Sequence, residues 1–202
     1  MLGPEQLADV EGDVSLLCQG AGVDVDQPLS MSALCEALTG APPLLDRNLG
    51  SARGMLRRGR VLIAPGLTVE QERHTIAHEL GEWFYDRRGY DEPDREARCD
   101  AVGAALCAPR SAFKRAMRTV GHRVSVLARA FVVEQSLALL RVGEVSGRPV
   151  MLLHPAGPIV RGDPFAWPST SALRRALEEG RETVHPIRIT DAASRWGLMA
   201  RR

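Results

Sequence analysis

The chain has 202 residues, of which 45% are apolar, and this suggests one domain, or one domain with an extension, around a sizeable core. Its formal net charge is +1, which gives no electrostatic reason to expect a nucleic acid or a membrane surface as partner. No apolar run approaches the roughly 20 residues of a membrane helix, and the N-terminal segment lacks the apolar core of a signal peptide, so we expect a cytoplasmic location.

The cysteines form no C-x-x-C pair, and the chain is neither short nor rich in cysteine. This usage is typical of a reducing compartment, where thiols stay free. Two of them lie eight residues apart in a predicted helix, and we interpret these as packing residues rather than zinc ligands. The four cysteines are Cys18, Cys35, Cys99 and Cys107.

Leucines at helical spacing predict a first helix over residues 29–40, and Gly40 is placed to end it. The apolar run 61–64, bounded by Gly59 and Pro65, predicts a short strand. We expect this strand to be the sheet edge along which an extended peptide could pair.

A capping-box pattern marks the start of the next helix, because Thr68 is followed three residues later by Gln71. The pattern predicts a helix over about 69–86. A second helix is predicted over 94–107, and further helical segments over 111–118 and 122–142.

Beyond residue 146 the pattern changes to short apolar runs broken by Pro and Gly, "VMLLHP" and "PIVRG", which indicate strands. A charged segment over 169–180 predicts a solvated surface helix. The fold class is therefore predicted to be α+β, with a core over 1–145 and a small β-containing extension over 146–202 that packs on it.

The helix 69–86 has one face of side chains that can bind a metal. At about 100° per residue, His74, His78 and Glu82 fall together, and Glu79 flanks them. In a His-Glu-x-x-His helix the two histidines hold zinc and the glutamate after the first one acts as general base. Here the second histidine is replaced by Glu82, giving "HELGE".

Three interpretations of that replacement stay open. Glu82 can be an altered ligand, since carboxylates are legitimate zinc ligands. The site can have lost its metal, or the helix can never have held one. His74 is a weaker candidate ligand, because pairing it with His78 would put Thr75 where the general base belongs.

The helix 94–107 supplies a partner for this face. Zinc peptidases often take a third ligand from a separate helix, and Glu96 is placed for that role. Asp100, four residues later, is placed to orient a ligand histidine through its other ring N–H. Small residues in this helix, among them Gly103, would let the two helices lie close together.

The segments "RVLIAPGLTVEQERHTIAHELGEWF", "EARCDAVGAALCAP" and "SVLARAFVVEQSLALLRVG" resemble the ImmA/IrrE family of metallopeptidases, in the family's order and over about residues 28–145. The resemblance implies a zincin-like core. Carried over by position, His78 is the first metal ligand, Glu79 the general base, Glu82 the second ligand, Glu96 the third, and Asp100 the supporting residue.

The resemblance also implies a function. A metal-dependent endopeptidase would cleave a cytoplasmic protein, for which a helix-turn-helix repressor of the kind found in bacteria and phages is a candidate. Zn²⁺ is the expected cofactor, with Mn²⁺ or another divalent ion as a substitute. The alternative is a catalytically inactive member that acts as a regulatory or partner-binding module.

Two other features have simpler interpretations. His122, His154 and His185 are isolated in sequence and are interpreted as structural or surface residues. The segment 123–142 resembles a helix-turn-helix, but no basic residue lies between Gln135 and Leu140, so we expect a packed helical pair rather than a DNA reader.

Overall fold

A computed structural model describes residues 2–25, 29–147, 150–154, 157–161, 184–189 and 195–200. Their contacts form two compact units. The first unit contains, among its described residues, α1 (Pro4–Gly20), α2 (Met31–Thr39), β1 (Leu44–Leu45), β2 (Gly54–Arg57), β3 (Arg60–Ile63), α3 (Val69–Arg87) and α4 (Arg95–Cys107). The second contains most of α5 (Arg110–Val120), with α6 (Val124–Phe131), α7 (Gln135–Ser146), β4 (Val150–His154), β5 (Gly157–Arg161), β6 (Val184–Ile189) and β7 (Arg195–Ala200).

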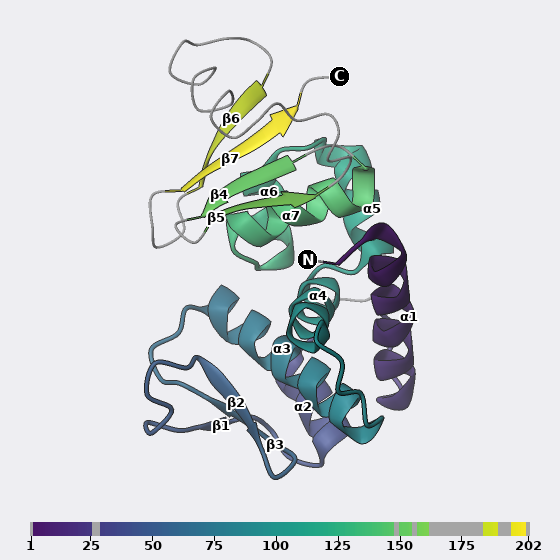
Figure 1. The fold of residues 1–202 in the computed structure, drawn as a ribbon, viewed down its shortest axis with the longest axis vertical. Helices are drawn as coiled ribbons and strands as arrows, with labels where there is room; N and C mark the ends of the chain where they lie inside the picture. The colour runs from purple at the N-terminus through teal and green to yellow at the C-terminus, as the bar shows by residue number, and fades with distance from the viewer. Residues whose placement is uncertain are drawn as a thin grey trace. The chain divides into compact units, whose positions relative to one another are not determined.

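The mixture of helices and two antiparallel or mixed sheets confirms the predicted α+β class (Figure 1). Local signals placed several boundaries correctly. The Ser30 side chain caps α2, and Gly40 ends it with a φ of 78°, a left-handed conformation that glycine adopts without strain.

The capping box at the start of α3 is present. The Thr68 hydroxyl accepts a bond from the backbone N–H of Gln71 at 3.3 Å, and the Gln71 side chain accepts one from the backbone of Thr68 at 3.2 Å. These two bonds satisfy N–H groups that the first turn of a helix leaves unpaired. The helix therefore begins where the sequence predicted it.

The predicted strand at 61–64 is β3, but its predicted place at the sheet edge is wrong. The strand order is β1-β3-β2, so β3 pairs with a strand on each side. Val61 and Ile63 are buried, while α3 packs against both β2 and β3. The exposed edge next to α3 is therefore β2, whose short sequence carries too weak a strand signal to be recognised.

The helix α1 has no counterpart among the predicted elements. Val10, Val14 and Leu17 are buried at helical spacing, and α1 packs against α4. The apolar period of that stretch could have revealed it, although the acidic residues between these positions make the segment look like a polar terminus.

The second unit contains a four-stranded sheet in the order β5-β4-β7-β6 among its described residues. This confirms the strands predicted after residue 146. The division into 1–145 and 146–202 stays a prediction, and the charged helix at 169–180 lies outside the described residues. In α7 the one basic residue, Arg141, is buried and pairs with Glu144 at 3.0 Å, so α7 exposes no basic side chain for reading DNA.

None of the described helices is long and apolar enough to cross a membrane.

Candidate metal centre

The close packing of α3 on α4 creates the candidate site. A Cβ atom at Gly81 would come within 3.2 Å of the Cys99 backbone, and one at Gly103 within 3.2 Å of the His78 backbone nitrogen. These contacts are tighter than a Cβ atom usually makes, so a larger residue at either point would have to displace its neighbours by a few tenths of an ångström. The prediction that small residues bring the two helices together is consistent with this geometry.

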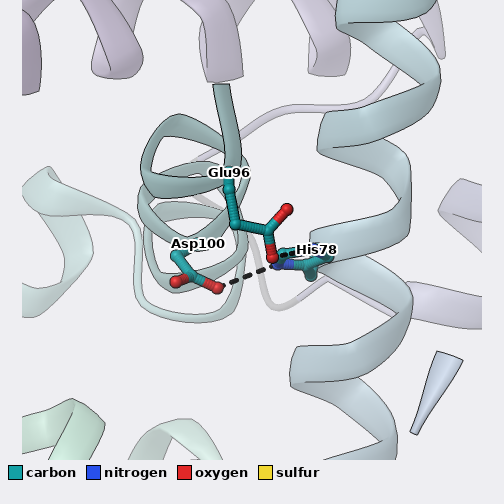
Figure 2. A group of neighbouring side chains, drawn as sticks. All are labelled: His78, Glu96 and Asp100. Atoms are coloured by element: carbon teal, nitrogen blue, oxygen red, sulfur yellow. Dashed lines mark hydrogen bonds and ion pairs between the residues drawn. The ribbon is translucent and has the colours of Figure 1, made fainter. Parts of the chain in front are cut away.

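The two ring nitrogens of His78 face different partners. Nδ1 lies 2.9 Å from Oδ1 of Asp100, within hydrogen-bonding distance (Figure 2). Nε2 lies 3.5 Å from Oε1 of Glu96 and 3.8 Å from Oε1 of Glu82. The structure thus brings together four of the residues that the sequence singled out, two from each helix.

The carboxylates differ in how open they are. The side chains of Glu96 and Asp100 are 75% and 63% exposed, whereas that of Glu82 is 30% exposed. The imidazole of His78 is only 16% exposed. A cation can therefore reach the centre from the α4 side, while the histidine is held against the helix pair.

The donor atoms fit a divalent cation. Ligand atoms of His78, Glu96 and Asp100 all lie within 4.8 Å of one another, and Glu82 is not in that group. The contact between Nδ1 and Asp100 nevertheless holds one side of the ring, and Nε2 is directed toward Glu96 and Glu82. A cation at Nε2 would meet Glu96 and Glu82 as its carboxylate neighbours, and imidazole with carboxylates suits Zn²⁺ or a harder divalent ion.

Glu79 lies beside this centre and is buried. Its Oε2 atom has no hydrogen-bond partner among the described residues. Burial, and next the charge of Glu82, raise the pKa of Glu79 to about 7. A buried carboxylate with an unsatisfied oxygen and a pKa near neutrality can exchange a proton with a reactant, and the orphaned oxygen is consistent with a site whose remaining partner is a ligand.

His78 and the neighbouring carboxylates shift one another's pKa values. Burial lowers the pKa of His78, but the hydrogen bond to Asp100 and the ion pair with Glu82 outweigh it and raise that pKa to about 10. The ion pair with His78 lowers the pKa of Glu82 in return. Without a metal, His78 is therefore a cation at neutral pH.

His74 lies one helical turn before His78, between α3 and α4. Burial lowers its pKa, and its ring hydrogen-bonds the backbone of Asp100. Its Nε2 would be 3.2 Å from a Cβ atom at Gly103. His74 thus supports the residue that orients His78 and is not among the atoms grouped around Nε2.

Two contacts were missed by sequence reasoning. A Cβ atom at Gly54 of β2 would be 2.6 Å from Oε1 of Glu79 and would also clash with Thr75. The guanidinium of Arg95 donates to the carbonyl of Glu82 at 3.4 Å and also pairs with Asp86. No local signal marks either residue, because each acts on a partner from another element.

The other candidate residues are the four cysteines and three further histidines. The thiols of the four cysteines are free and buried. Burial raises the pKa of both Cys99 and Cys107 to about 12, so neither is a thiolate at neutral pH. His122 lies between α5 and α6, and His154 and His185 lie in β4 and β6.

Comparisons with known proteins give a family and a similar fold. The model of the IrrE N-terminal-like domain, a peptidase family, matches residues 41–142. A search of curated proteins found no match. A solved structure of a Mycobacterium tuberculosis transcriptional regulator is similar in fold, with a TM-score of 0.66, 14% identity, and coverage of 95% of this chain and 87% of that one.

The matched family is one of metal-dependent, protease-like domains, and its model spans half of the chain, from β1 into α7. The potential ligands on α3 and α4 lie within the matched residues. The chain therefore belongs to the family of peptidases described as the IrrE N-terminal-like domain.

Proposed function

We propose that this protein is a metal-dependent endopeptidase whose metal is held by His78, Glu82 and Glu96. The observation that carries the proposal is that the two ring nitrogens of His78 have different partners. Nδ1 bonds Asp100, while Nε2 faces the two glutamates. A histidine fixed in this way presents one defined nitrogen to a cation, which is how metal-binding histidines are commonly oriented.

Glu79 would act as the general base. When bound, a divalent cation supplies a Lewis acid that polarises a scissile carbonyl and acidifies water. Glu79 accepts the proton of the attacking water and passes it to the leaving amine. Its pKa of about 7 suits both steps, because a group that titrates near the working pH can take up and release a proton.

The second carboxylate sets the choice of ion. Two carboxylates and one neutral imidazole carry a charge of −2, which cancels a divalent cation, whereas two histidines and one glutamate would leave +1. An additional oxygen ligand shifts preference toward harder ions, so we expect Mn²⁺ to compete with Zn²⁺.

The substrate is proposed to be a cytoplasmic protein. The family resemblance favours a helix-turn-helix transcriptional repressor, and one solved relative in fold is itself named a transcriptional regulator. The roles of Asp100 and His74 would be to position His78, and neither would touch the substrate.

A second candidate function has its own supporting observation. With its pKa raised to about 10, His78 remains protonated and compensates the surrounding carboxylates without any metal. Such a self-compensated cluster would also suit a non-catalytic member that binds a partner.

Metal content and one base variant test the proposal. Elemental analysis of protein purified without chelator should find one divalent ion per chain. Glu96→Ala should lower the metal occupancy of the site more than His74→Ala does.

Glu79→Gln should retain the metal but lose about 10²–10⁴-fold in the rate of cleavage of a substrate, because the amide cannot accept a proton. A chain that neither contains nor takes up metal would leave the non-catalytic function as the better account.

A further inference from the structure

The hairpin of β2 and β3 has a strong concentration of positive charge. No acidic residue occurs from 47 to 69, while this stretch includes five arginines, in a chain whose net charge is +1. Four of them belong to the hairpin or directly precede it, and all four are exposed. None of these four forms an ion pair or a hydrogen bond through its side chain with the residues that the structure describes. They are Arg53, Arg57, Arg58 and Arg60.

Folding disfavours charge at these positions. Arg57 pairs directly opposite Arg60, and like charges in that position destabilise a hairpin. The connecting turn consists of Arg58 and Gly59, with φ of 53° and 75°, and a turn of this kind prefers Asn, Asp or Gly at its first position. The arginines therefore work against the stability of the hairpin, which points to a role in binding.

The hairpin also borders the candidate metal centre. β2 is an edge strand of the first sheet, and its Gly54 lies so close to Glu79 that a Cβ atom there would be 2.6 Å from Oε1. An extended segment that paired with the exposed edge of β2 would thus run past the general base. Main-chain pairing of this kind is a general mode of peptide recognition.

The side chains that such a segment would meet follow from the register. Met55 pairs with Leu62 and Leu56 with the buried Val61, so Leu56 faces α3 and Met55 faces away. Arg57 is two residues after Met55 and shares its side, since alternate residues of a strand do. Arg53 directly precedes the strand, and its carbonyl accepts a bond from the backbone N–H of Ala64 at 2.8 Å, which continues the pairing by one residue and places Arg53 on the same side. This side of β2 therefore reads arginine, methionine, arginine at alternate positions.

We propose that β2 binds an extended peptide segment of the substrate in which two acidic side chains flank an apolar one at alternate positions, acidic-x-apolar-x-acidic. Cross-strand neighbours of opposite charge stabilise pairing, and Met55, which is 42% exposed, offers an apolar contact between them. The pattern is the same in both chain directions, so it does not depend on whether the segment runs parallel or antiparallel. This inference rests on the proposed function, because it assigns the substrate class of that site.

Binding to defined peptides tests it. Fluorescence anisotropy would be measured on the full chain carrying Glu79→Gln, so that no cleavage intervenes. One labelled peptide is Ser-Glu-Ser-Leu-Ser-Glu-Ser, and the other is Ser-Ser-Glu-Leu-Glu-Ser-Ser, with identical composition but with the acids on the face opposite to leucine. The first peptide should bind more tightly, and the difference should shrink between about 0.05 M and about 0.3 M salt.

The matched variants change the same number of charges. Arg53→Gln with Arg57→Gln should weaken binding of the first peptide by about two- to thirty-fold, the range for two exposed ion pairs. Lys114→Gln with Arg118→Gln, on the exposed face of α5, should leave it unchanged. Equal binding of the two peptides, or equal losses in the two double variants, would overturn the proposal.

Two further outcomes separate the alternatives. Tighter binding of a duplex DNA oligonucleotide than of the first peptide, lost in the Arg53 and Arg57 variant, would assign the surface to nucleic acid and overturn the peptide assignment. Pattern-dependent binding without any cleavage by the unmodified chain would refute the peptidase and leave the peptide site standing. Cleavage by the unmodified chain at equal rates for both peptides would refute the peptide site and leave the peptidase standing.

Discussion

At the scale of the residue, the centre depends on what the position one turn after His78 presents. Glu82 supplies an oxygen 3.8 Å from Nε2, whereas a histidine would supply a second nitrogen and one fewer negative charge. Both ligand types occur at zinc sites, but zinc tolerates nitrogen better than harder ions do. We therefore expect the identity of this one side chain to set both the affinity for a metal and the preference among metals.

The corresponding prediction concerns Glu82→His, which restores the His-Glu-x-x-His motif. Zinc should bind at least about tenfold more tightly, a change of the size seen when a residue that orients a metal ligand is mutated. The ratio of the zinc affinity to the manganese affinity should also increase. Isothermal titration with each ion measures this. Glu82→Gln is the control, since it removes the charge but supplies no nitrogen. If Glu82→His brings no gain in zinc affinity, the position does not face the metal and "HELGE" belongs to an ordinary helix.

At the scale of the element, the crossing of α3 and α4 is the feature that assembles the site. Gly103 lies where a Cβ atom would be 3.2 Å from the backbone nitrogen of His78. Backbone cannot move aside as a flexible side chain can. We therefore expect a larger residue there to displace α3 from α4 by a few tenths of an ångström, and with it the imidazole of α3 from the carboxylates of α4.

Gly103→Ala should therefore destabilise the fold by about 1–3 kcal/mol, the usual cost of overpacking, and weaken metal binding at the same time. Gly12→Ala is the matched control. Gly12 lies within α1, is exposed, and has nothing within 4 Å of its missing Cβ, so alanine should stabilise by about 0.5–1 kcal/mol. Urea denaturation of both variants gives the comparison. Equal stability of Gly103→Ala and the parent would contradict the tight crossing.

At the scale of the whole molecule, the charge cluster links stability to pH. The pKa of His78 in the folded, metal-free protein is raised from 6.5 to about 10. The folded state thus holds this proton more firmly than the unfolded state does. The resulting stabilisation is complete below pH 6.5 and is lost as the pH rises toward 10. The pKa of Glu79 is raised too, so its contribution has the same sign and is lost through about pH 7.

We therefore expect the free energy of unfolding, measured with chelator present, to fall between pH 7 and pH 8.5 by on the order of 1 kcal/mol per pH unit. His78→Gln should flatten that slope. Excess zinc should reverse it, because a metal needs the neutral imidazole and binds better as the proton leaves. Thermal unfolding in a series of buffers measures all three. A metal-free protein that gains stability over this interval would show that His78 is not the cation of the cluster.

Much of the fold could be predicted because its signals are local. The caps of α2 and α3 lie within a few residues of the helices that they begin or end. His78 and Glu82 share a helix face because they are one turn apart, and Glu96 and Asp100 do so for the same reason. Elements with weak or mixed patterns were missed, namely α1, β1, β2, β6 and β7.

The sequence by itself therefore determined the two helices, the residues that each turns toward a common face, and the family to which they belong. Only the tertiary structure decided which ring nitrogen of His78 meets Asp100 and which meets the glutamates. It also decided that β2 is an edge strand and that its Gly54 lies against Glu79. The physical reason is that helix periodicity acts over four residues, whereas strand order and the distance between two helices depend on packing between segments far apart in the chain.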